Sequence, residues 1–547
     1  MPALSAFGPD FPFAYDAWLT HPAGLGAIPA ERHGERVAIV GAGAAGVIAG
    51  HELMKLGLRP VLYESARFGG RLRSEIFEGT EDVVAELGGM RFPVSSRAFY
   101  HYVDLVGCES APFPNPLTEA AGSTVIDLEG ETLFARRLAD LPPVYREVAD
   151  AYDAALEEGA GFSALQAAMR ARDPARVKAL WDPLVRDWDE RTFYEFVTTS
   201  RAFRALSFRH REIFGQVGFG TGGWDSDFPN SMLEILRVNL SGFDEGQRYI
   251  RGGVEQVLHR LWRLPARAAH WPEGTTLAAL NEGTTRARVV RIARHPSGML
   301  AVTDRWGRTD LYAAVLVTCQ SHLLTTAIET DEALLAQKLW MALDRTRYMQ
   351  AAKTFVMVDR PFWKDLDPAT GRPLLSMTLT DRITRGTYLF DDGPDRPGVI
   401  CLSYSWMTDA LKVLPLDAEK RVELALAALG HIYPNLDIAS HIRGNPICVS
   451  WEADQNFLGA FKGALPGHYR YNHRMYGHFM QQALPAAERG IFLAGDGVSW
   501  TPAWVEGAVQ TALNAVWGIA RHFGGASAPG NPGPGDLYPT LGPIALD

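Results

Sequence analysis

The sequence predicts a two-domain α+β protein, in which a Rossmann-like GxGxxG nucleotide-binding domain is joined to a domain of mixed sheet and helices. A glycine motif, GAGAAG at residues 41–46, follows a short β-branched run and opens a helical stretch. Residues 140–215 carry apolar side chains at helical spacing, whereas strand-like runs recur between residues 287 and 451. The chain has 547 residues and is 47% hydrophobic, which is enough to bury more than one core.

Composition excludes several classes of protein. The net charge is −10 and no basic run occurs, so neither a nucleic acid nor an anionic membrane surface is an expected partner. No apolar stretch reaches the roughly 18 residues that span a bilayer, and no signal peptide is visible, so we expect a cytoplasmic protein. The four cysteines form no CxxC pair, which predicts neither a metal site nor a disulfide framework: Cys108, Cys319, Cys401 and Cys448.

The first third of the chain opens with an aromatic arm and a βαβ unit. Residues 1–33 are rich in Pro, Gly and aromatic residues, and we expect them to pack on the body as an extended arm. Residues 36–40 and 60–64 read as strands that flank a helix at 44–58. The region 140–215 follows as the helical part of the second domain.

The rest of the chain supplies further strands and two amphipathic helices. The Pro/Gly-rich residues 526–547 read as a linker-like tail. The helices are expected at 417–431 and 504–523, and the strands at 287–304, 311–319, 354–359, 398–406 and 446–451.

The glycine motif predicts a diphosphate-binding turn. Gly41 provides the tight turn, Gly43 lets a pyrophosphate approach the backbone, and Gly46 lets helix and strand pack closely. The helix that begins with Ala44 and Ala45 directs its N-terminus at the phosphates. Residues expected to extend the site are Glu64, for the ribose hydroxyls, and Gly69, Gly70 and Arg71, for the phosphates.

A second motif near the C-terminus identifies the nucleotide. GIFLAGDGVSW, residues 490–500, is a strand that ends in Gly-Asp and is followed by a helix. The arrangement resembles flavoproteins of the amine-oxidase type, in which this acid reaches the ribityl and pyrophosphate and the helix points at the flavin. The resemblance implies FAD as cofactor, with Asp496, Trp504 and Val505 beside it.

A third motif, ELGGMRFP at residues 86–93, resembles the glycine-doublet and arginine motif of flavin-dependent L-amino-acid oxidases and monooxygenases. With GFGTGGWDSDFPNSMLEI and SWTPAWVEGAVQT, it gives the chain a likeness to the bacterial L-amino-acid 2-monooxygenases over nearly its whole length. Within that family the lysine enzymes are more similar than the tryptophan enzymes. The resemblance implies an amine-oxidase-type fold and places Gly89, Met90 and Arg91 beside the flavin.

The same resemblance implies a discontinuous domain plan. We expect the FAD domain to be assembled from residues 34–110, 236–335 and 480–525. The substrate domain then takes residues 111–235 and 336–479.

The chemistry requires a fixed cation for an α-carboxylate, and Arg91 is the candidate because a guanidinium grips a carboxylate with two hydrogen bonds. A structural salt bridge is the competing interpretation. The resemblance places Lys353 near flavin N5, where it would position a water or assist the reaction with O2. It also implies aromatic walls for the substrate, although such residues are usually core: Trp406, Trp451, Phe461 and Trp504.

The segment GGWDSDFPNS, residues 222–231, contains two aspartates that could hold a cationic side chain. Asp227 matches the ammonium acceptor of the lysine enzymes, but Asp225 would share its face in a strand, so both remain candidates. Phe243 departs from the family, whose lysine enzymes have a small cysteine there, and could shorten the pocket. Gly252, Gly253 and Val254 resemble a backbone contact to the adenine side of FAD.

The resemblance implies that a Cα hydride passes from an L-amino acid, most simply L-lysine, to flavin N5. Decarboxylation with O2 would then give 5-aminopentanamide, CO2 and water. The alternatives are an L-amino-acid oxidase that gives keto acid, ammonia and H2O2, or a 2-monooxygenase for arginine, ornithine or tryptophan. A flavin-binding protein without activity and a nicotinamide-dependent dehydrogenase are more remote. The aromatic arm favours a homo-oligomer, such as a dimer.

Overall fold

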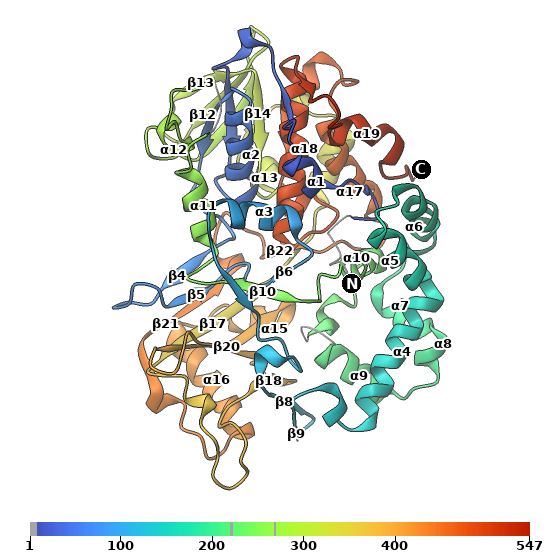
Figure 1. Cartoon of the computed structure of the whole chain (residues 1–547), viewed down its shortest axis with the longest axis vertical. Coiled ribbons are helices and arrows are strands. Elements are labelled where there is room, and N and C mark those ends of the chain that lie inside the picture. The colour runs from blue at the N-terminus through green and yellow to red at the C-terminus, as the bar shows by residue number, and fades with distance from the viewer. Residues whose placement is uncertain (1–7, 219–222, 267–269, 547) are drawn as a thin grey trace.

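The computed structural model describes residues 8–218, 223–266 and 270–546. Residues 1–7 of the predicted arm, 219–222 of the two-aspartate motif region and residue 547 lie outside that description. A parallel sheet with its helices occupies the upper half of Figure 1, a large sheet lies below it, and a group of helices lies beside them. The fold class predicted from the sequence is confirmed.

The upper half is built on a parallel sheet with the strand order β23-β14-β2-β3. The predicted βαβ opening is confirmed as β2 (Arg36–Val40), α2 (Ala44–Lys55) and β3 (Arg59–Tyr63). The other two strands come from distant parts of the chain, β14 (Ala314–Val317) and β23 (Ile491–Leu493). Helix α18 (Val505–His522) packs against α2 and covers the sheet.

The lower half is built on a seven-stranded sheet with the order β21-β17-β20-β19-β18-β8-β9. Every residue of β17 is buried, and helix α16 (Ala418–Ile432) packs on its neighbours β20 and β21. The strands are β8 (Thr124–Leu128), β9 (Glu131–Ala135), β17 (Ala351–Val358), β18 (Met377–Thr380), β19 (Gly386–Phe390), β20 (Gly398–Trp406) and β21 (Ile442–Ser450).

Further helices and short strands complete the fold. The predicted helical region is confirmed as α4 (Pro143–Ala160), α5 (Phe162–Arg170), α6 (Pro174–Trp188), α7 (Phe193–Thr199), α8 (Arg201–Arg204) and α9 (Phe208–Val217), followed by α10 (Met232–Leu240). The connecting strands include β4 (Ser74–Ile76), β5 (Val84–Glu86), β10 (Gln247–Ile250), β11 (Val289–Arg294), β16 (Tyr348–Met349) and β22 (Phe461–Lys462).

The two ends of the chain are more ordered than the sequence suggests. The tail forms β24 (Ala526–Ser527), which pairs with β1 (Gly26–Ala27) of the arm, and helix α19 (Pro534–Leu541). The reason is close packing, because a Cβ at Gly535 would lie 2.1 Å from the Trp517 ring.

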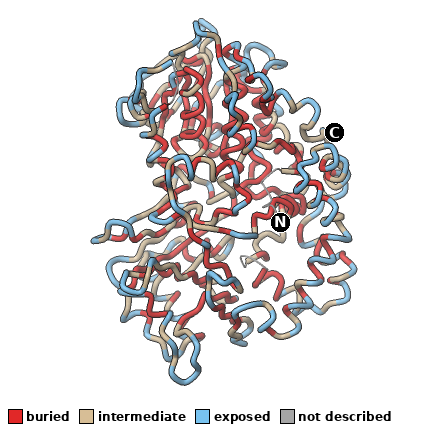
Figure 2. Tube along the Cα trace, in the orientation of Figure 1, coloured by how far each residue is buried: buried red, intermediate tan, exposed pale blue. Residues whose placement is uncertain are grey.

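Aromatic residues of the arm are buried within the same chain: Phe11, Phe13, Tyr15 and Trp18. These four side chains therefore do not supply the aromatic surface on which the expectation of a dimer rested, and the dimer itself stays a prediction. Figure 2 shows buried residues along the interior strands and helices and exposed residues on the outer loops. Within the described ranges, no helix is both long and apolar enough to cross a membrane.

Candidate active site

A cavity of about 350 Å³ lies between the two sheets. One part of its wall comes from the carboxyl ends of the parallel strands, with Gly41 after β2 and Thr318 after β14. Another part comes from the seven-stranded sheet, with Lys353 on β17 and Tyr404 on β20. In α/β sheets, ligands bind at the carboxyl ends of the strands, and this cavity has that position.

The glycine motif forms the expected cradle. Gly41 has φ of 115°, and a Cβ there would lie 2.6 Å from Thr318 Oγ1. Gly43, Ala44 and Ala45 line the cavity at the start of α2. Gly46 does not line it; a Cβ at Gly46 would lie 2.0 Å from Gly41 O, so this glycine permits the close approach of helix and strand.

Glu64 lies at the edge of the cradle with its carboxylate held by backbone amides. Its Oε2 accepts from Ala42 N at 2.8 Å and its Oε1 from Ser65 N at 2.8 Å. Arg288 and Val289 continue the cavity wall beside Glu64, and neither was predicted from the sequence. Val289 only begins an ordinary strand, β11, so no local motif marks it.

The expected contact from Val254 is not found at this cavity. Val254 is fully buried outside the lining, and its N–H donates to Glu86 Oε1 at 2.7 Å. The neighbouring Gly252 and Gly253 line a separate pocket. The prediction that the backbone of residues 252–254 contacts the adenine side of FAD is therefore corrected. Val254 N instead holds the side chain of Glu86 in place.

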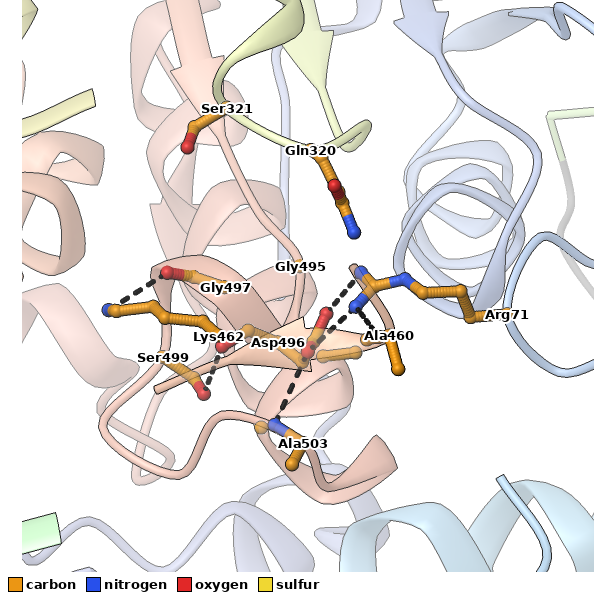
Figure 3. A network of polar contacts seen from close by, with 12 residues as sticks. Arg71, Gln320, Ser321, Ala460, Lys462, Gly495, Asp496, Gly497, Ser499 and Ala503 are labelled. Atoms are coloured by element: carbon orange, nitrogen blue, oxygen red, sulfur yellow. Dashed lines mark hydrogen bonds and ion pairs between the residues drawn. The ribbon is translucent and has the colours of Figure 1, made fainter. Parts of the chain in front are cut away.

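Arg71 and Asp496 join the two ends of the nucleotide site (Figure 3). The Arg71 guanidinium donates two hydrogen bonds to the Asp496 carboxylate, at 3.1 and 2.5 Å, and a third to Ala460 O at 2.9 Å. Ala503 N also donates to Asp496 Oδ2, at 3.3 Å. This pairing holds the loop before α18 against the phosphate cradle, where Gly70 also lines the cavity.

Helix α18 directs its N-terminus at the cavity. Trp504 precedes its first turn and Val505 begins it, and both residues line the cavity. The free N–H groups of a helix N-terminus favour negative charge. The glycine cradle, Glu64, the Arg71–Asp496 pair and this helix end together fit FAD.

Arg91 lies on the cavity wall among aromatic rings. Its guanidinium carbon is 5.6 Å from the ring centroids of Phe113 and Tyr404 and 5.8 Å from that of Tyr388. Its Nη1 is buried and has no hydrogen-bond partner in the part of the chain that the structure describes. A buried donor without a partner is costly, so the site favours an anionic ligand that accepts from it. Gly89 and Met90 line the cavity beside it.

Lys353 is a buried lysine on the same wall. Its Nζ donates to Glu86 O at 3.0 Å and to Gly88 O at 2.6 Å, and lies 4.7 Å from the centroid of the Tyr404 ring. Burial lowers the pKa of Lys353 to about 7. The amine can therefore be neutral near pH 7, whereas a solvated lysine on a strand would be charged there.

The two aspartates of the 222–231 segment have different environments. Asp227 lines the cavity, and its Oδ1 accepts from Asn230 Nδ2 at 3.0 Å. Burial raises the pKa of Asp227 to about 8, assisted by the nearby carboxylates of Glu234 and Asp244. Asp225 does not line the cavity; it accepts from Gln216 Nε2 at 3.2 Å and pairs with a guanidinium of the seven-stranded sheet, Arg385, at 3.5 Å.

Two further carboxylates, which the sequence analysis missed, line the same cavity. Glu234 accepts from Ala464 N at 2.7 Å, and burial raises its pKa although the charge of Lys462, which also lines the cavity, opposes the shift. Asp244 accepts from Asn239 Nδ2 at 3.1 Å, and burial raises its pKa to about 6. For Glu234 the sequence does offer a signal. It lies among the apolar residues that form the buried face of α10, where an acid without a special role is unexpected.

The four predicted aromatic walls line one cavity, whereas Phe243, which was expected to shorten the pocket, does not. Trp406, Trp451, Phe461 and Trp504 all line the cavity. Phe243 does not; it is 0% exposed, and its ring lies behind Trp504 at a centroid distance of 4.9 Å. The expectation that Phe243 itself shortens the pocket is therefore corrected, since it acts on the wall through Trp504.

A model of flavin containing amine oxidoreductases matches residues 44–520. The chain belongs to this family. It is 30% identical to a tryptophan 2-monooxygenase of Pseudomonas savastanoi, over 93% of each chain. It is 21% identical to a putative L-amino-acid oxidase of Bacillus subtilis, over 90% of this chain and 96% of that protein.

Solved structures of the same fold include a putrescine oxidase bound to putrescine, with a TM-score of 0.65 and 18% identity over 89% of this chain and 98% of that one. Cyclohexylamine oxidase from Brevibacterium oxydans matches with a TM-score of 0.61 and 18% identity, over 89% of this chain and 99% of that one. This amine oxidoreductase therefore has the predicted fold and the predicted cofactor, FAD. The curated relatives named above are not lysine enzymes, so the family is confirmed and the choice of substrate depends on the cavity.

Proposed function

We propose that this flavoenzyme is an L-amino-acid 2-monooxygenase whose substrate carries a cationic side chain, with L-lysine as the first candidate. The observation that carries the proposal is a group of buried carboxyls in the cavity wall. The buried carboxyl of Asp227 lies there with those of Glu234 and Asp244. The same cavity contains Arg91, whose buried Nη1 has no partner among the described residues.

These groups suit the two ends of lysine. Arg91 binds the α-carboxylate and fixes the orientation of the Cα–H bond. Asp227 accepts the side-chain ammonium, which could not be buried without a partner except at a cost of several kcal/mol. An indole in that position would leave buried carboxyls facing an apolar ring, which is unfavourable. The cavity thus supports lysine over tryptophan, although the curated relatives named above include tryptophan enzymes.

The residues of the chain prepare the substrate for oxidation. The oxidant at this site would be FAD, which supplies an acceptor for two electrons and the Cα hydrogen of the amino acid. Arg91 and the aromatic walls hold the substrate against the flavin site. Lys353 Nζ donates two hydrogen bonds, to the carbonyls of Glu86 and Gly88. Because its pKa is about 7, Nζ can hold or release the proton that the substrate's amino group loses on oxidation.

The fate of the oxidised amino acid then depends on retention. If Trp451, Phe461 and Trp504 keep it in the cavity and exclude water, lysine and O2 give 5-aminopentanamide, CO2 and H2O. If it escapes, lysine, O2 and water give the keto acid, ammonia and H2O2. The resemblance to the 2-monooxygenases supports the first outcome.

The product balance tests the proposal. L-lysine is supplied to the FAD-loaded enzyme, and amide, CO2, H2O2 and ammonia are each measured against O2 consumed. We expect amide and CO2 in amounts equal to the O2 used, and slower turnover of L-tryptophan. Peroxide in place of amide would mean an oxidase, and a preference for tryptophan would remove Asp227 from its proposed role.

A further inference from the structure

A second pocket of about 60 Å³ lies outside the active-site cavity, between the β4–β5 hairpin, β10 and the seven-stranded sheet. Most of its lining is apolar and comes from strands of both halves of the molecule. The residues used below are Val84 on β5, Tyr249 on β10, Phe355 on β17 and Val399 on β20. The proposed function assigns no role to this side pocket.

The side pocket changes character from its outer to its inner end. At the outer end, Asp82 pairs with Arg396 at 2.5 Å, and both side chains are about half exposed. Asp392 is paired with Arg251 in the same way. At the inner end the walls are buried, with Phe355 1% and Met90 3% exposed. An entrance near the surface therefore leads to an apolar interior.

The inner end adjoins the reacting centre. Met90 lines both the side pocket and the active-site cavity. Glu86 lines the side pocket, and its backbone carbonyl accepts from Lys353 Nζ at 3.0 Å on the cavity side. A flexible, unbranched methionine is thus the side chain shared by the two spaces, and methionine adapts its shape easily.

The chemistry of the side pocket does not suit an amino acid. Behind the mouth the lining holds two carboxylates, and both already have partners. Glu86 accepts from Ser74 Oγ at 2.9 Å and from Val254 N at 2.7 Å, and Asp391 pairs with Lys364 at 2.6 Å. The arginines at the mouth are already paired with aspartates. What remains is a small apolar space, which favours a small apolar molecule.

We propose that this side pocket is a dioxygen site that supplies O2 to the Lys353 side of the cavity past Met90. The inference rests on the proposed function, in which O2 is consumed. It also meets a requirement of that function, because O2 must reach the cofactor site while the oxidised amino acid is still held in the main cavity. Dioxygen that arrives from behind Met90 need not displace either of them.

Xenon provides a test that does not depend on turnover, because it occupies small apolar cavities. Crystals of the FAD-loaded enzyme are pressurised with xenon. We expect a xenon peak in the side pocket, bounded by Val84, Phe355 and Val399. Xenon found solely in the main cavity would overturn the proposal.

Kinetics provide the second test. Val84→Phe places a ring in the side pocket, and Ile76→Phe is the matched control, because Ile76 pairs with Val84 in the β4–β5 hairpin but is 55% exposed and does not line the pocket. We expect Val84→Phe to lower kcat/KM for O2 about tenfold, with anaerobic reduction by the amino acid unchanged and the control unaffected.

The two half-reactions separate the failure of this inference from the failure of the proposed function. An unchanged kcat/KM for O2 in folded Val84→Phe would overturn the dioxygen route. If lysine does not reduce the wild-type enzyme, the proposed substrate is wrong, and the same O2 measurement is made with whichever amino acid does reduce it. Should Val84→Phe fail to fold, the xenon experiment on the wild-type enzyme still decides.

Discussion

At the residue scale, the two aspartates of the 222–231 segment differ in what they face. Asp227→Asn removes the charge proposed to hold the substrate ammonium, so we expect kcat/KM for lysine to fall by about 100-fold or more. FAD binding should be retained. Asp225→Asn is the control, because Asp225 already pairs with Arg385 outside the cavity. Steady-state kinetics of both variants decide, and equal losses would contradict the assignment.

The raised pKa of Asp227 gives this residue a pH dependence. The folded enzyme without substrate keeps a proton on Asp227 up to about pH 8, whereas the unfolded chain releases it near 3.8. Its contribution to stability is therefore fully present below 3.8 and is lost as the pH rises through 8. Lysine binding needs the charged form, so KM for lysine should fall as the pH rises toward 8. Measured KM and thermal unfolding profiles should both lose this step in Asp227→Asn.

Arg91 should act on every substrate alike. Arg91→Gln removes the partner of the α-carboxylate, which all L-amino acids share. We expect lysine, arginine and ornithine to lose kcat/KM by the same factor, about 100-fold. A substrate panel measures this, and a loss confined to lysine would place Arg91 at the side-chain end instead.

Sequence reasoning succeeded at this scale where a local motif fixed the geometry. Gly41 and Gly43 lie in one turn, so their spacing alone indicated the phosphate cradle. Glu234 and Val289 reach the cavity through tertiary packing, and nothing within a few residues of them marks that position. At Val254 a local pattern misled the prediction. The Gly-Gly-Val sequence resembles a contact to FAD, but Val254 N donates a buried hydrogen bond to Glu86.

At the element scale, the start of helix α18 depends on what packs behind it. Phe243→Leu leaves space behind Trp504, which lines the cavity beside the helix N-terminus. We expect a loss of stability of about 1–2 kcal/mol and a shift of products from amide toward H2O2, because a looser wall admits water. Amide and peroxide per O2 measure the shift. An unchanged ratio would show that Trp504 holds its position without Phe243.

Element prediction was reliable where periodicity was strong, as in β2, α2 and α18. It was wrong for the tail, whose Pro and Gly content is typical of a linker. The Trp517 ring lies against Gly533 and Gly535 so closely that only glycine fits at either position. A Cβ at either residue would come within 2.3 Å of the ring. Composition alone cannot distinguish a flexible glycine from one that allows a close contact.

At the scale of the whole molecule, the main cavity exists because segments far apart in sequence meet. The parallel sheet takes strands from residues 36–63, 314–317 and 491–493, and the opposite wall is built on the seven-stranded sheet. The resemblance to a family, rather than periodicity, supplied this discontinuous plan. The bounds of the two domains remain a prediction.

The N-terminal arm should stabilise this arrangement through one buried ion pair. Asp10, 0% exposed, accepts from Arg237 of α10 at 2.6 and 3.0 Å and from Trp181 Nε1 of α6 at 3.0 Å. The Arg237 guanidinium also lies 4.7 Å from the centroid of the Trp500 ring, in the loop that leads to α18. One residue of the arm therefore ties together the helical region and the cofactor site.

Asp10→Asn removes the carboxylate that accepts two hydrogen bonds from the buried Arg237, and we expect the free energy of unfolding to fall by about 3–5 kcal/mol. The matched control is Asp16→Asn, also on the arm, whose more exposed pair with Arg172 should contribute less than about 1 kcal/mol. Urea unfolding of both FAD-loaded variants measures the difference. Adding Arg237→Met to Asp10→Asn should recover part of the loss, since it removes the unpaired charge. Equal effects of the two single changes would mean that the arm is held by its aromatic residues and not by this pair.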